Sequence, residues 1–227
     1  MAMNVGFLLF PRFTQLDLTG PYEVLSRLPS VSMHLVSETL DGARSDTGLT
    51  LAPTHTFESA PQLDLLCVPG GAGVNAVIES DAALTFLEEQ GARARYVTSV
   101  CTGALALGAA GLLRGYRATT HWRYLELLSR FGAEPVKQRV VIDRNRVTGA
   151  GVTAGIDFAL TLAAELYGEK LACEIQLYIE YDPAPPFASG SPQIAAEQLV
   201  YSVRDKTRDA YAERVAVLDR WEARRRG

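Results

Sequence analysis

The sequence is poor in cysteine and histidine, and it contains no long apolar run. Only three cysteines and three histidines occur among its 227 residues. The cysteines, Cys67, Cys101 and Cys173, form no Cys-x-x-Cys pair, which argues against a disulfide framework and against a zinc site. The longest apolar candidate, VTAGIDFALTLAAELYG, is interrupted by Asp157 and is shorter than the ~20 residues of a membrane-spanning helix. We therefore expect no disulfide, no metal and no membrane span.

An excess of charge of one sign is also absent. The 22 basic and 26 acidic residues give a net charge of −4, which does not attract a polyanion to the whole surface, so we expect no nucleic-acid partner. The basic run Arg224–Arg226 fits a solvated helix end. The first residues, MAMNVGFLLFPRF, lack the basic region and cleavage site of a signal peptide, and we interpret them as a strand. These features favour a cytoplasmic protein.

Apolar runs that alternate with helical patterns make up most of the chain. Strands are expected at 4–10, 31–36, 63–70, 95–100 and 139–149, and helices at about 19–28, 81–92, 102–113, 121–131 and 153–167. This order predicts βαβ units in an α/β three-layer sandwich, with a mostly parallel sheet between two layers of helices. Ligands of such folds bind beyond the carboxyl ends of the strands.

Two turns at that edge carry the residue types of a catalytic site. The segment SVCTGALALGAAGLL places Cys101 between an apolar strand and a small-residue helix, which is the setting of a cysteine nucleophile elbow. The helix N-terminus below the sulfur favours a thiolate. The segment VPGGAG forms a glycine-rich loop that contains Gly70 and Gly71. If the two loops meet, the backbone N–H groups of Gly71 and Thr102 could stabilise negative charge on a substrate.

The other cysteines and the C-terminal segment have structural interpretations. Cys67, inside DLLCVP, fits the core of a buried strand, and Cys173 fits the apolar side of a helix over EKLACEIQLYIEY. The stretch DPAPPFASGSPQ predicts a surface arm or linker, followed by one or two charged amphipathic helices. We expect a site-bearing domain at 1–181, and at 182–227 a proline-rich arm and a C-terminal helical extension of the same domain, associated with dimerisation.

The segments DLLCVPGGAG, VTSVCTGALALGAAGLLRGYRATTHW and VTGAGVTAGIDFAL together resemble the ThiJ/PfpI superfamily of class I glutamine amidotransferase-like proteins. The resemblance covers residues 4–181. Within the superfamily, FTQLDLTGPYEVL and CTGALALGAAGLL are most similar to the isocyanide-hydrating members, and next to the amidotransferase-like half of AraC-type regulators. The resemblance implies a flavodoxin-like fold, a homodimer, a small isocyanide as substrate and a reaction without a cofactor.

Two departures from the superfamily narrow the activity. Glutamine amidotransferases complete a Cys-His-Glu triad with a late His-x-Glu pair, whereas the histidines here are His34, His55 and His121. PfpI-like peptidases carry a histidine directly after the cysteine, and Thr102 occupies that position here. Neither glutaminase nor peptidase activity is therefore expected.

The resemblance also implies two residues beside Cys101. Asp17 corresponds to an acidic residue that approaches the nucleophilic sulfur, and an aspartate there matches the isocyanide-hydrating members. Alternatively, Asp17 caps a helix that begins near Thr19. His121 stands twenty residues after Cys101, where ThiJ-like proteins carry a histidine near the sulfur. It could tune the thiol or orient a water, or it could be a helix N-terminal residue whose ring is satisfied by a backbone carbonyl.

The implied reaction converts an isocyanide into an N-formamide. Cys101 attacks the isocyanide carbon as a thiolate, Asp17 donates a proton, and a covalent thioimidate forms. The same carboxylate then activates a water. Two other functions fit the same thiol: a glyoxalase or deglycase of the ThiJ-like kind, and a redox sensor whose cysteine oxidises without turnover.

Overall fold

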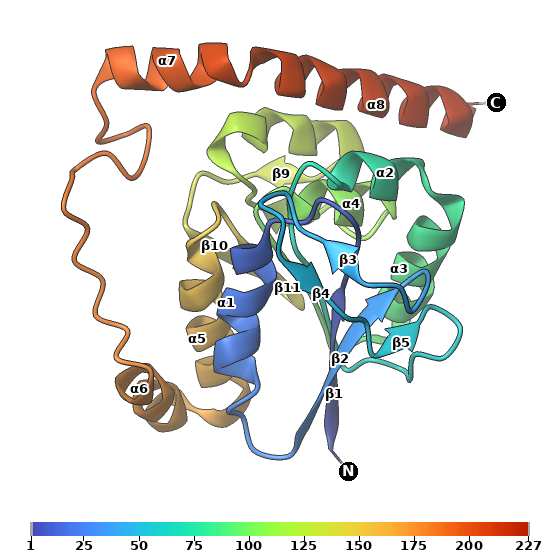
Figure 1. Ribbon diagram of the computed structural model, residues 1–227, viewed down its shortest axis with the longest axis vertical. Coiled ribbons are helices and arrows are strands. Elements are labelled where there is room, and N and C mark those ends of the chain that lie inside the picture. Colours follow the sequence, from blue (N-terminus) through green and yellow to red (C-terminus); the bar gives the residue numbers. More distant parts are fainter. Residues whose placement is uncertain (1, 227) are drawn as a thin grey trace.

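The computed structural model describes residues 2–226, and among these residues seven strands form one central sheet (Figure 1). In spatial order the strands are β10 (Val140–Asp143), β11 (Arg146–Gly149), β7 (Tyr96–Val100), β6 (Leu65–Val68), β1 (Met3–Leu8), β2 (Val31–Ser37) and β5 (His55–Thr56). All neighbouring pairs are parallel except β10 and β11. In the centre of the sheet, Val5 lies between Met33 of β2 and Leu65 of β6. The mostly parallel sheet is therefore confirmed.

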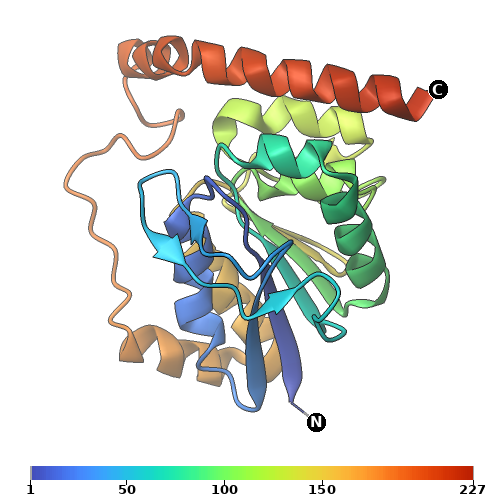
Figure 2. The same cartoon turned by 45° about the vertical axis from the view of Figure 1, so that its right-hand side comes forward.

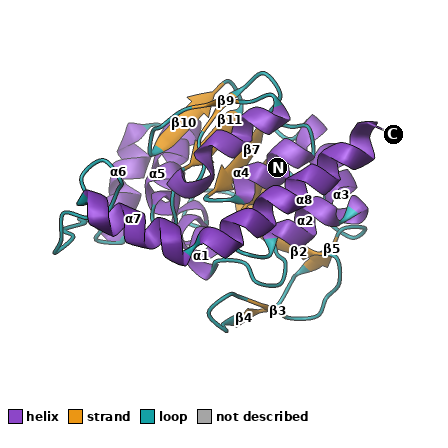
Figure 3. Cartoon of the chain, turned by 90° about the horizontal axis from the view of Figure 1, so that it is seen from above, coloured by secondary structure: helices purple, strands orange, loops and turns teal. Residues whose placement is uncertain are grey.

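Helices cover both faces of this sheet, as the view in Figure 3 shows. On one face α1 (Gln15–Leu25) packs against α5 (Ala154–Tyr167), and α6 (Glu169–Tyr178) packs against α5. The other face carries α2 (Val74–Glu79), α3 (Asp81–Arg93) and α4 (Gly103–Ala109). The expected α/β class is confirmed. Over the described range, none of the helices is both long enough and apolar enough to cross a membrane.

Short elements connect these layers. A small antiparallel pair joins β3 (Ala43–Arg44) to β4 (Thr50–Leu51), and a small parallel pair joins β8 (Arg117–Ala118) to β9 (Glu134–Pro135). The 3₁₀ helix η1 (Trp122–Phe131) lies between β8 and β9 in the chain. Strand β8 contacts β10 and β11 at one edge of the central sheet, and η1 contacts α4.

The composition of the central elements explains their position. All four side chains of β6 are buried, as expected for a parallel strand that is covered on both faces. Helix α4, with the sequence GALALGA, is buried over its whole length, because its small side chains let it lie close to its neighbours. A Cβ at Gly108 would overlap the Phe131 ring of η1, so this close approach needs a glycine.

Several expected boundaries differ from the structure. Helix α1 begins at Gln15 rather than near Thr19, which puts Asp17 inside its first turn. The segment expected as one strand at 139–149 is a hairpin of β10 and β11, because Arg144 adopts a left-handed φ of 55° at the turn. Cys173, expected to have a structural role on the apolar side of its helix, is exposed, because α6 turns Ala172 and Ile175 inward instead.

The C-terminal segment forms an arm and two helices. After α6 an extended stretch leads away from the body to α7 (Glu197–Lys206) and α8 (Arg208–Arg226), which lie across the carboxyl end of the sheet (Figures 1 and 2). Helix α8 packs against α2. Trp221 Nε1 donates to the Ala109 carbonyl at 3.3 Å, and Arg220 forms an ion pair with Glu79. Part of the chain beyond residue 182 therefore covers the edge where the candidate site lies.

Candidate active site

Cys101 occupies the turn between β7 and α4, with a left-handed φ of 55°. This conformation is strained for a residue with a side chain, and the neighbouring segments hold it in place. The Cys101 N–H donates to the Gly149 carbonyl at 3.1 Å, and the Thr120 hydroxyl donates to the Cys101 carbonyl at 2.6 Å. The side chain is nearly enclosed, with 6% of the residue exposed.

The residues around this turn leave no room for larger side chains. A Cβ at Gly103 would overlap the carbonyl oxygen of Val68, so the start of α4 lies directly on the end of β6. A Cβ at Gly70 would come within 2.7 Å of both Asp17 Oδ2 and Thr102 Oγ1. Glycine at these two positions therefore allows the cysteine turn and the glycine-rich loop to meet.

The Asp17 carboxyl is fully buried and bonds across to the glycine-rich loop. The Gly70 N–H donates to Asp17 Oδ2 at 2.9 Å. The N-terminal cap of α1 is Thr14, and Asp17 lies within the first turn of the helix. The alternative that Asp17 caps a helix beginning near Thr19 is therefore wrong. Asp17 Oδ1 has no hydrogen-bond partner among the described residues, and the Cys101 thiol interacts with this carboxyl.

Burial dominates the electrostatics of the pair. It raises the pKa of Asp17 from 3.8 to about 7, although the Gly70 N–H and Cys101 oppose that rise. Burial also raises the pKa of the Cys101 thiol well above its usual value, and the Asp17 carboxylate raises it further. The Thr102 N–H and the Arg214 guanidinium lower the Cys101 pKa, but they do not outweigh burial. The start of α4 therefore favours the thiolate, as expected, but burial has the larger effect on the pKa.

Two of the backbone donors of the glycine-rich loop already have acceptors in this structure. The Gly70 N–H bonds to Asp17, and the Gly71 N–H donates to Thr102 Oγ1 at 3.0 Å. The Thr102 hydroxyl in turn donates to the Gly71 carbonyl at 3.3 Å. Gly71 adopts a φ of 128° and pairs with Phe13 of the loop before α1. The two loops therefore do meet, and charge stabilisation by Gly70, Gly71 and Thr102 stays a prediction.

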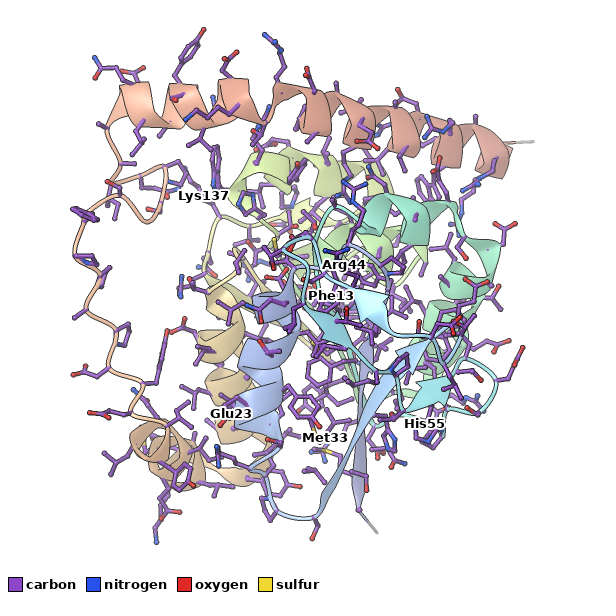
Figure 4. All side chains as sticks on the ribbon, in the orientation of Figure 1. Phe13, Glu23, Met33, Arg44, His55 and Lys137 are labelled. Atoms are coloured by element: carbon purple, nitrogen blue, oxygen red, sulfur yellow. The ribbon has the colours of Figure 1, made fainter. Side chains whose placement is uncertain are left out.

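The histidines lie in different surroundings. His121 is the N-terminal cap of η1, where its Nδ1 accepts from the Arg123 N–H at 3.3 Å, and burial lowers its pKa. The helix N-terminal position therefore fits the alternative, but the ring accepts from a backbone N–H instead of bonding to a backbone carbonyl. A role of His121 in tuning the thiol stays a prediction. The His34 and His55 rings meet edge to face at 4.9 Å. In Figure 4, His55 lies at the sheet edge, away from Phe13 beside the site. No cluster of three potential metal ligands occurs within 2–226.

Three residues of the site were not expected from the sequence. Thr120 holds the cysteine turn, as described above. Arg214 of α8 is 3% exposed, and its Nη2 donates to the Gly71 carbonyl at 3.0 Å. Tyr124 of η1 lies with its ring 5.5 Å from the Arg214 guanidinium carbon. One signal was available, because Arg214 shares a helical face with the apolar residues Val217 and Leu218, where a charge is unusual.

Known proteins match this chain over most of its length. The DJ-1/PfpI family model matches residues 3–165. An isonitrile hydratase of Pseudomonas putida is 56% identical over 224 residues, which cover 99% of this chain and 98% of that protein. The crystal structure of a ThiJ/PfpI family protein from Pseudomonas syringae matches with a TM-score of 0.94 at 42% identity, and covers 96% of this chain and 91% of that one.

A regulator shares part of the same architecture. The HTH-type transcriptional regulator GbdR of Pseudomonas aeruginosa is 33% identical over 189 residues, and this chain spans 51% of its length. The resemblance inferred from the cysteine turn and the glycine-rich loop is confirmed. Since the family model covers well over half of the residues, the chain belongs to the DJ-1/PfpI family.

Proposed function

We propose that this protein hydrates isonitriles, also called isocyanides, to N-formamides at Cys101. The buried pair of Cys101 and Asp17 carries the proposal, because it places a nucleophile beside a carboxyl whose pKa is about 7. Such a carboxyl can both give and take a proton near neutral pH. The 56% identity to an isonitrile hydratase over nearly the whole chain supports this substrate class.

In the first half-reaction the turn at Cys101 acts as a nucleophile elbow. The Asp17 carboxylate takes the thiol proton while the sulfur attacks the terminal carbon of R–N≡C, which forms the S–C bond. Asp17 then delivers that proton to the same carbon. The product is the thioimidate Cys101–S–CH=N–R, and the carboxylate is regenerated.

In the second half-reaction Asp17 accepts a proton from a water that attacks the thioimidate carbon. The C=N electrons move to nitrogen, which takes the proton back from Asp17. The C–S bond then breaks, and the hydroxyl proton returns to the sulfur through Asp17. Addition of one water to one isonitrile thus gives R–NH–CHO and the starting thiol. Backbone N–H groups of the glycine-rich loop and of Thr102 stabilise charge on the way once substrate displaces their present acceptors.

Incubation of the pure protein with an aryl isonitrile tests the proposal. Formamide, identified by mass, should accumulate with the parent protein and should be absent with Cys101→Ala. Methylglyoxal offered under the same conditions distinguishes the glyoxalase alternative. Consumption of methylglyoxal without any hydration of the isonitrile would contradict the proposed function.

We also propose that residues 182–227 extend the unit formed by 1–181 and take part in a homodimer. The contacts of α8 with α2 support the first part. Large apolar side chains are exposed on α6, the arm and α7, where a second copy could cover them: Leu177, Tyr178, Phe187, Ile194, Leu199 and Tyr201. Light scattering at micromolar concentration should give twice the 24.6 kDa chain mass, and a monomer would contradict the dimer.

A further inference from the structure

Arg214 is a buried cation without an ion-pair partner among the described residues. Its guanidinium uses Nη2 to donate to the Gly71 carbonyl, while Nε and Nη1 are buried and have no acceptor within residues 2–226. A charged group removed from water and only partly hydrogen-bonded is costly to keep in a folded protein. Its retention at this position therefore needs an explanation other than stability.

The other basic side chains at the C-terminal end of α8 behave as ordinary surface contacts. Arg220 is half exposed and pairs with Glu79, and Arg224 donates to the carbonyls of Ile78 and Glu79. These contacts hold the helix against the end of α2. Docking of α8 thus does not depend on Arg214 alone.

The single bond of Arg214 reaches the centre of the site. The Gly71 carbonyl that it contacts also accepts from the Thr102 hydroxyl, next to Cys101. The Gly71 N–H, in the preceding peptide, donates to the same hydroxyl. The guanidinium charge also lowers the pKa of the Cys101 thiol. Arg214 is therefore connected to the nucleophile through the orientation of one peptide and through space.

We propose that Arg214 is a positioning residue for the Cys101 reaction, which fixes the Gly71 peptide and stabilises negative charge on the sulfur. The C-terminal helix thereby supplies a cation to a site whose nucleophile and carboxyl, Cys101 and Asp17, come from the first half of the chain. For the hydration step this inference rests on the proposed function. The effect on the thiol does not depend on the identity of the substrate.

The charged and titratable groups around the sulfur come from four elements. Asp17 of α1 faces Cys101 and opposes ionisation of the thiol. The charge of Asp46, in the loop after β3, raises the pKa of Asp17. The charge of Arg214 lowers the pKa of Tyr124 of η1, and that of Cys101 raises it. Among these groups Arg214 is the cation that favours the thiolate, so its removal should shift thiol ionisation in one direction.

The test measures the rate of iodoacetamide alkylation at Cys101 from pH 6 to 10, followed by peptide mapping so that the exposed Cys173 is counted separately. Arg214→Met should shift the pH dependence of Cys101 alkylation to higher pH by about one unit. Below the midpoint, alkylation at any fixed pH should then be about tenfold slower than in the parent. Arg214→Gln should shift it as well, because it keeps a donor for Gly71 but removes the charge. Arg214→Lys should restore much of the parent profile.

Arg220→Met is the matched control, since it removes a contact of the same helix on α2 and leaves the site untouched. It should give the parent profile. With an aryl isonitrile, Arg214→Met should lower kcat about tenfold or more, with a smaller change in KM.

Unchanged alkylation profiles in both Arg214→Met and Arg214→Gln would overturn the inference. An equal shift in Arg220→Met would also overturn it, because looser docking of α8 would then explain the effect. If Arg214→Met does not fold, the contrast between the Gln and Lys variants decides the question. If the parent does not hydrate isonitriles, the alkylation profiles still test the role of Arg214 independently.

Discussion

Replacement of Asp17 by asparagine should stabilise the protein above neutral pH while it impairs catalysis. The native fold raises the pKa of Asp17 from 3.8 to about 7. Between these values the folded protein binds a proton that the unfolded chain has lost, so stability falls as pH rises. The loss is about 1.4 kcal/mol per pH unit, or about 4 kcal/mol once the pH exceeds 7. Below pH 4 the carboxyl is protonated in both states and this loss disappears.

Asparagine carries no charge, so Asp17→Asn escapes this loss, while its amide oxygen can still accept from the Gly70 N–H. Urea unfolding of both proteins at pH 4.5 and pH 8 measures the difference. We expect the variant to gain stability relative to the parent between the two pH values, by up to ~3 kcal/mol. The same variant should lose at least about 100-fold in formamide formation, because no proton can be moved by the side chain.

The control is Asp157→Asn, which makes the same chemical change at a carboxylate paired with Arg139. It removes an ion pair at the surface, so it should lower stability at pH 8 slightly rather than raise it. If Asp17→Asn changed the unfolding free energy equally at both pH values, the raised pKa of Asp17 would be refuted.

Three further expectations concern the turn and the thiols. Thr120→Val removes the hydrogen bond to the Cys101 carbonyl and should cost about 1 to 3 kcal/mol in urea unfolding; an unchanged midpoint would contradict its role. Gly103→Ala should be destabilising by about 3 kcal/mol or more, or should not fold, and a stable, active variant would show that the close approach to β6 can relax. A bulky maleimide should label the exposed Cys173 in the native protein. Burial raises the pKa of Cys67 to about 12, so this thiol should react only after unfolding. Labelling of Cys67 in the native protein would be inconsistent with its burial.

The sheet and the cysteine turn could be predicted because their signals are local. Buried parallel strands appear as continuous apolar runs, and the small residues after Cys101 indicate a helix that lies close to the sheet. The hairpin at residues 140–149 was missed although its two-residue turn contains Asn145, because the left-handed position is taken by Arg144 rather than by a glycine or an asparagine. A left-handed arginine gives no signal in the sequence.

The partners within the site depend on contacts between distant segments. Asp17 meets Gly70, 53 residues later, and Arg214 meets Gly71, 143 residues earlier. Periodicity within one helix cannot specify either contact. The raised pKa of Cys101 could not be predicted for the same reason: the helix N-terminus is visible in the sequence, but the depth of burial is set by the whole fold.

The central claim is that hydration proceeds through a covalent bond between Cys101 and the isonitrile carbon. Acid quenching of the parent protein during turnover of an aryl isonitrile, followed by peptide mapping, tests it directly. The peptide that contains Cys101 should gain the full mass of one isonitrile, since nothing leaves when the thioimidate forms, and this mass should decay as formamide appears. Formamide produced at the same rate by Cys101→Ala, or turnover without any modified Cys101 at millisecond quench times, would contradict the claim.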